Sequence, residues 1–158
     1  MFARNQGLHK RKAFTLTEVL MVVIILSLFA GFALPVYSKA VRKNKERTAV
    51  NNLRLLHAAA LIYWAKNGTL WDPGVAWESN LSNINAALGT SVVDTTGLMT
   101  YRYRVQGGSP PTMLRLDVTW TEGGDTSKIH FNENVSTRVT DGPCCEPSST
   151  YCLIVPNC

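Results

Sequence analysis

The chain has 158 residues, which is room for one domain of ordinary size and a membrane anchor, and its formal net charge is +5. The basic residues are concentrated near the start. Residues 1–13 hold four of them and no acidic residue, and residues 39–47 hold five against one glutamate. Residues 48–158 hold seven basic and nine acidic residues, a net charge of −2. A nucleic-acid-binding protein would need a basic face on its folded domain, so we expect no nucleic-acid partner.

A long apolar segment follows the basic leader. No charged residue occurs in residues 19–38. As a helix these residues would extend about 30 Å, the thickness of a bilayer core, so they predict a single membrane span. Glu18 lies just inside the edge of this segment. An acidic residue at the centre of a span costs about 2.5–3.5 kcal/mol, and less near the edge, so its presence indicates a specific role.

The helical pattern continues beyond the apolar segment. Apolar residues recur every three or four positions and form one stripe, which consists of Ala49, Leu53, Leu56, Ala60, Tyr63 and Trp64. His57 falls between them and is expected on the polar surface. Asn67-Gly68 is a helix-ending pair, so the pattern predicts one helix over residues 14–66, about 80 Å long. Its first half needs lipid or partner helices, and its second half has a stripe to bury on a domain.

Gly31 and Pro35 are the weak point of this predicted helix. Pro35 has no N–H to donate to the carbonyl of Gly31, and its ring crowds that carbonyl. Glycine is also the poorest helix former after proline. We expect a bend here that lets subunits pack or a filament stretch; the alternative is an ordinary kink.

The rest of the chain predicts a small β-rich domain. A short helix pattern over residues 80–88 ends at Gly89, after which the apolar period changes to two. The predicted strands are residues 101–105, 114–120 and 129–131, with a candidate fourth strand over 135–140. Short Gly-rich breaks between them are typical of an antiparallel meander.

One face of such a sheet is apolar and needs cover. The stripe on the long helix is the expected cover, and Trp71 and Trp77 are expected to add to it. The predicted fold class is therefore α+β: a long N-terminal α-helix, whose first half is transmembrane, packed through its second half on a small antiparallel β-sheet.

All four cysteines lie near the end, at Cys144, Cys145, Cys152 and Cys158. Late, clustered cysteines behind an export-type N-terminus predict disulfide bonds in an oxidising compartment. A zinc site of four cysteines is the alternative, but no C-x2-C pair is present. Adjacent Cys144 and Cys145 cannot bridge each other without strain, which leaves two pairings: 144–152 with 145–158, or 144–158 with 145–152.

The N-terminal region resembles a known family. A basic leader, the small residue Ala13, and then Phe14-Thr-Leu-x-Glu18 opening an apolar helix are similar to the type IV pilins and the type II secretion pseudopilins. Pro35 also stands where these proteins commonly have a helix-bending proline. Two residues depart from the pattern, since Ala13 replaces the usual glycine and Thr17 replaces the usual apolar residue.

The resemblance implies that a membrane peptidase cuts between Ala13 and Phe14 and methylates the new amino terminus. Phe14 and Glu18 are one helical turn apart, so they share a helix face. The carboxylate would lie near the positive end of the helix dipole and near the new ammonium group. In lipid its best partner is the amine of a neighbouring subunit, which would set the axial register of assembly.

The expected organisation is a leader over residues 1–13, a transmembrane assembly helix over 14–38, an amphipathic second half over 39–68 and a globular headgroup over 69–158. By resemblance, the headgroup is periplasmic, the N-terminus is cytoplasmic, and the protein moves from the bacterial inner membrane into an extracellular pilus or a periplasmic pseudopilus. The basic residues just past the span are expected to meet the acidic headgroups of other subunits in an assembly; the alternatives are contact with lipid phosphates and a solvated face.

The expected function is that of a structural subunit of a type IV pilus or pilus-like filament. Its partners would be further copies, related minor pilins, the prepilin peptidase and an inner-membrane assembly platform. The alternatives are a type II secretion pseudopilin and an exported, soluble, disulfide-containing binding domain whose signal peptide is cut near Leu34. We find no catalytic motif and no cofactor or metal-ligand pattern, so we expect no enzymatic activity.

Overall fold

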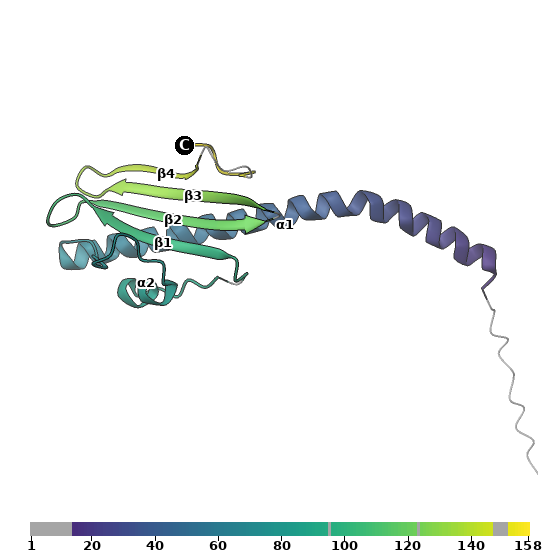
Figure 1. Ribbon diagram of the computed structural model, residues 1–158, viewed down its shortest axis with the longest axis horizontal. Coiled ribbons are helices and arrows are strands. Elements are labelled where there is room, and N and C mark those ends of the chain that lie inside the picture. Colours follow the sequence, from purple (N-terminus) through teal and green to yellow (C-terminus); the bar gives the residue numbers. More distant parts are fainter. Residues whose placement is uncertain (1–13, 95, 123, 147–151) are drawn as a thin grey trace, which may run out of the picture. The chain divides into compact units, whose positions relative to one another are not determined.

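The computed structural model describes residues 14–94, 96–122, 124–146 and 152–158. It divides into two compact units, the first ending at Ala40 and the second running from Val41 to Cys158. The elements within the described residues (Figure 1) are α1 (Leu16–Asn67), α2 (Leu81–Leu88), β1 (Met99–Gln106), β2 (Met113–Glu122), β3 (Asp125–Asn134) and β4 (Val139–Cys145). The long helix predicted over residues 14–66 is confirmed.

The first unit is the apolar part of α1. This stretch is long and apolar enough to cross a membrane, and none of its most apolar part is buried among the described residues. Large side chains such as Val23 and Phe29 are more than half exposed. The hydroxyl of Ser27 donates a hydrogen bond to the carbonyl of Val23 at 2.7 Å, so this polar group is satisfied within the helix.

The helix backbone continues without interruption through Gly31 and Pro35. The bend expected at these two residues therefore stays a prediction about the assembled protein.

The second unit contains the sheet, whose strands are antiparallel in the order β1-β2-β3-β4. The register pairs Tyr101 with Val118 and Leu116 with Phe131, so alternate residues of neighbouring strands share a face. The meander predicted from the period of two is confirmed. Figure 1 shows the second half of α1 lying along one face of this sheet.

The core lies between α1 and that inner face. Leu53 and Leu56 of α1 are buried against residues such as Tyr103, Leu116 and Val118 of the sheet. Burying a side chain of this size stabilises the fold by about 1.5–3 kcal/mol. The predicted role of the helix stripe is thereby confirmed.

Trp71 adds to this core as expected. Its indole lies 5.1 Å from the ring of Tyr103, and its carbonyl accepts a hydrogen bond from the Tyr103 hydroxyl at 2.9 Å. Burial raises the pKa of Tyr103 well above that of a free tyrosine, because the phenolate would be poorly solvated there.

The fourth strand is later in the chain than the sequence predicted. Residues 135–138 form a turn, and β4 begins at Val139 and continues through Gly142-Pro143 to Cys145. A Gly-Pro pair usually ends a strand, but β4 is an edge strand, where proline is tolerated. The pairing with β3 shifts register between His130 and Asn132, which is a bulge. Gly142 has a φ of 114°, and a Cβ there would lie 2.6 Å from the carbonyl oxygen of His130.

Candidate functional site

The start of α1 holds the residues that the sequence singled out for assembly. Thr15 and Glu18 bond reciprocally: the N–H and the hydroxyl of Thr15 each donate to the Glu18 carboxylate at 3.0 Å. The N–H of Glu18 lies 3.3 Å from the Thr15 hydroxyl oxygen, which accepts from it. Phe14, just before this pair, is 83% exposed. This arrangement is a capping box, which satisfies two of the unpaired N–H groups at a helix N-terminus.

The capping box gives Glu18 a partner within its own chain. Sequence reasoning considered the helix dipole and the new ammonium group, above all that of a neighbouring subunit, and overlooked the Thr15-x-x-Glu18 spacing, which is the usual signal of such a box. The box holds the carboxylate at the exposed end of the helix, one turn from Phe14. Ala13, the residue before the expected cut, lies outside the described residues.

This same segment matches a motif found in other proteins. A family model described as the prokaryotic N-terminal methylation motif matches residues 8–34. The chain carries this motif. The motif is typical of type IV pilins and pseudopilins, so the resemblance based on Phe14-Thr-Leu-x-Glu18 is confirmed, and the α+β fold is pilin-like. Comparison of the chain with curated proteins and with solved structures gives no match.

The methylation motif bears on how the chain is processed, anchored and assembled. It implies processing by a prepilin peptidase, anchoring through the apolar helix and assembly into a filament. It also implies a structural rather than an enzymatic role. Residues beyond the motif determine how the headgroup is held together and which surfaces it presents.

Glu46 fixes the C-terminal segment to α1. Its side chain is only 1% exposed, although it lies within the basic stretch that the sequence assigned to lipid or to other subunits. The carboxylate accepts backbone hydrogen bonds from Leu153, Ile154 and Val155 at 2.8, 2.9 and 2.7 Å. Three N–H donors to one carboxylate are strong, charge-assisted hydrogen bonds. No local sequence signal reveals this contact, because its partners are backbone groups far along the chain.

Lys45, the neighbour of Glu46, also bonds within its own headgroup. Its ammonium group lies 3.2 Å from the carboxylate of Glu122 at the end of β2. Lys45 thus pairs with an acidic residue of its own headgroup, a partner that the interpretation of the sequence did not include.

The cysteines form two disulfide bonds, Cys144–Cys158 and Cys145–Cys152. This is one of the two pairings that the sequence left open. His130 on β3 lies beside the first bond, with its Nε2 atom 3.1 Å from the sulfur of Cys158. His130, Cys144 and Cys158 each offer one possible ligand atom, and the three atoms lie within 4.8 Å of one another, but sulfurs in a disulfide are not the thiolates that bind zinc.

His57 is not a surface residue as the sequence suggested. Its side chain is 14% exposed, and its Nε2 atom forms a hydrogen bond with the carboxylate of Glu133, which is 6% exposed. The imidazole also packs 4.2 Å from the ring of Phe131. His57 thus joins α1 to the inner face of β3.

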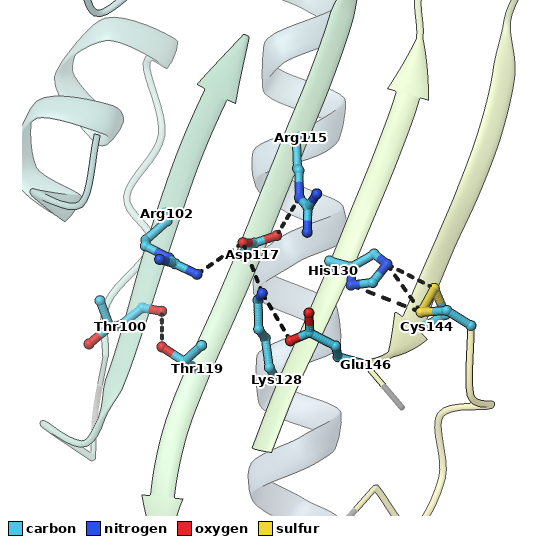
Figure 2. A network of polar contacts seen from close by, with 10 residues as sticks. Thr100, Arg102, Arg115, Asp117, Thr119, Lys128, His130, Cys144 and Glu146 are labelled. Carbon is cyan, nitrogen blue, oxygen red and sulfur yellow. Dashed lines mark hydrogen bonds and ion pairs between the residues drawn. A yellow bond between two sulfur atoms is a disulfide. The ribbon is translucent and has the colours of Figure 1, made fainter. Parts of the chain in front are cut away.

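The outer face of the sheet, opposite α1, carries a polar network (Figure 2). Its centre is Asp117 on β2, which is fully buried although its position in the strand faces outward. Arg102 and Arg115 donate to its carboxylate at 3.1 and 3.2 Å, and the Lys128 ammonium lies at 3.8 Å. Lys128 also pairs with Glu146 at 2.9 Å. The hydrogen bond from Lys128 holds the pKa of Glu146 below that of a free glutamate.

Trp77 belongs to this outer face and not to the core, which corrects the expectation from the sequence. The guanidinium carbons of Arg102, Arg104 and Arg115 lie 4.8, 5.4 and 5.6 Å from the centroid of its ring. Such distances are typical of cation–π contacts. The sequence could not show this, because the arginines come from two strands whose register is set by the fold.

Proposed function

We propose that this protein is a structural subunit of a type IV pilus or pilus-like filament, and that it polymerises through its N-terminal helix. The observation that carries the proposal is the methylation motif over residues 8–34 at the start of an exposed apolar helix, which is continuous with a pilin-like headgroup. A helix with no apolar cover of its own needs lipid before assembly and partner helices afterwards.

In this proposal the peptidase cuts between Ala13 and Phe14, and the new terminus is methylated. Glu18 then exchanges its bonds with Thr15 for the amine of a neighbouring subunit. Before the cut that amine does not exist, so assembly awaits processing. The Thr15 bonds keep the carboxylate partnered in the meantime.

The orientation belongs to the same proposal: leader in the cytoplasm, headgroup in the periplasm. It is supported by the two disulfide bonds of the headgroup, because disulfides persist in oxidising compartments such as the periplasm. The proposed partners are further copies of the chain, related minor pilins and an inner-membrane assembly platform.

The deciding measurement is the intact mass and N-terminal sequence of the mature protein. We expect a chain that begins at N-methylated Phe14 and still contains the apolar helix. A chain that begins near Leu34 would instead identify a conventional signal peptide and an exported soluble domain. Electron microscopy of a deletion strain then separates a surface pilus, whose long fibres would disappear, from a periplasmic pseudopilus.

A further inference from the structure

The outer face of the headgroup sheet concentrates positive charge. Residues 48–158 contain seven basic side chains, and four of them gather on this face from three adjacent strands: Arg102, Arg104, Arg115 and Lys128. Asp117 and Glu146 are the acidic groups that pair with them. The cluster therefore keeps a net charge of +2 within residues 48–158, whose own net charge is −2.

Arg104 is the least compensated member of the cluster. Its guanidinium lies against the side-chain amide of Gln106, and it forms no ion pair with any acidic group in the part of the chain that the structure describes. It stands directly opposite Arg115 in the register of β1 and β2. Like charges directly opposite each other destabilise a sheet. A local arrangement that the fold does not favour is a mark of a functional surface.

The arginines are also held in place. The buried carboxylate of Asp117 fixes Arg102 and Arg115, and the ring of Trp77 lies against all three guanidinium groups. The Nε atom of Arg102 is buried and has no hydrogen-bond partner among the described residues. Positioned side chains lose less conformational entropy when they bind a ligand, which raises affinity.

We propose that this outer face binds a linear polymer that carries phosphate groups. Guanidinium groups match the geometry of phosphate oxygens and bind them through paired hydrogen bonds. Neighbouring strands are about 4.8 Å apart, so cations on three strands can meet more than one phosphate at once. This spacing favours a chain of phosphates over a single free ion. The sequence predicted no nucleic-acid partner because no basic face was apparent, and the register of the strands creates such a face.

The test uses the full chain in a non-ionic detergent, with inorganic polyphosphate as the probe. Calorimetry measures binding at salt concentrations from about 50 to about 200 mM, because counterion release makes such binding salt-dependent. The informative variant is Arg104→Gln, which leaves the three partners of Asp117 intact. We expect it to weaken binding about tenfold, since charge-assisted hydrogen bonds are strong. It should also reduce the slope of log K against log salt by about one. An unchanged melting temperature would show that it folds.

The matched control is Arg54→Gln, which removes an exposed arginine on α1, away from the outer face. It should bind polyphosphate like the parent chain. Three results would overturn the proposal: no binding by the parent chain at 50 mM salt, equal weakening by both variants, or equally tight binding of polyglutamate of matched charge. The last result would identify an acidic polypeptide as the partner instead.

Discussion

The carboxylate of Glu46 accepts a hydrogen bond from the backbone N–H of Val155 at 2.7 Å and so joins residues 109 positions apart in the chain. Two further N–H groups donate to the same carboxylate, which is buried. The segment that carries Cys152 and Cys158 is therefore held on α1 by the Glu46 carboxylate, while its two disulfide bonds join it to β4. Neither the disulfides nor the apolar stripe alone determines where this segment lies.

Replacing Glu46 with alanine should destabilise the headgroup. The change leaves three backbone N–H groups without their acceptor, and losing hydrogen bonds to a buried charged group costs about 2–3 kcal/mol or more. Urea unfolding of the full chain in detergent measures the effect. The matched control is Glu122→Gln, which removes the surface ion pair with Lys45 and should cost less than about 1 kcal/mol. Similar losses for the two variants would contradict the role assigned to Glu46.

Glu18→Ala should leave insertion and cleavage intact and remove most filament assembly. The proposed reason is that the carboxylate is the partner of the neighbouring subunit's amine. Intact mass reports the cleavage, and electron microscopy reports the filaments. Normal filaments from this variant would refute the pairing.

Thr15→Val separates the two roles of the capping box. It removes the hydroxyl that bonds Glu18 but keeps the carboxylate, and losing such a cap costs about 1 kcal/mol. We expect this variant to form filaments, with the start of the helix more exposed to hydrogen exchange. If Thr15→Val abolished filaments as completely as Glu18→Ala, the cap and not the charge would be what assembly needs.

His57→Leu should cost about 3–5 kcal/mol of unfolding free energy, because it leaves the buried carboxylate of Glu133 without its partner. The double variant His57→Leu, Glu133→Met removes both polar groups and should recover much of the loss. Chemical denaturation of the parent chain, of both single variants and of the double variant provides the comparison. A double variant that is as unstable as the sum of the single changes would show that the two residues act independently.

The ion pair of Lys128 with Glu146 makes headgroup stability depend on acidity. Because the hydrogen bond from Lys128 lowers the pKa of Glu146 below the ordinary 4.5, the ionised form is favoured in the folded state. The contribution of this ion pair to stability is complete at pH values above the ordinary pKa of 4.5. It is lost as the pH falls through the lowered pKa of Glu146. Glu146→Gln should therefore be less stable than the parent near pH 7, with the difference shrinking toward pH 3. Thermal melts across this range test it, and a constant difference would argue against the pair.

The sequence predicted the parts of the fold that have a regular period. The stripe through Leu53 and Leu56 and the alternation around Tyr101 and Leu116 each follow from local geometry, and both lie where expected. The fourth strand was misplaced because Gly142-Pro143 reads as a break. Only its position on a sheet edge, opposite a bulge in the pairing with β3, makes this pair compatible with a strand.

The candidate site was less predictable for a related reason. Glu18 stands out because a charge at the edge of an apolar segment violates a local rule. Glu46, His57 and Trp77 violate none, and their partners are distant residues that only the folded register brings near. Their roles depend on tertiary contacts, for which a single sequence has no periodic signal.

Each edge strand of the headgroup sheet has one backbone bridge to another part of its own chain. On β1, Glu78 exchanges two backbone hydrogen bonds with Tyr103, at 2.9 and 2.8 Å. On β4, Cys145 donates to the carbonyl of Pro156 and accepts from the N–H of Cys158. Unpaired edges are where sheets join to one another and aggregate. These bridges cover part of each edge, and so reduce the number of backbone groups through which headgroups crowded at high density could pair strand to strand.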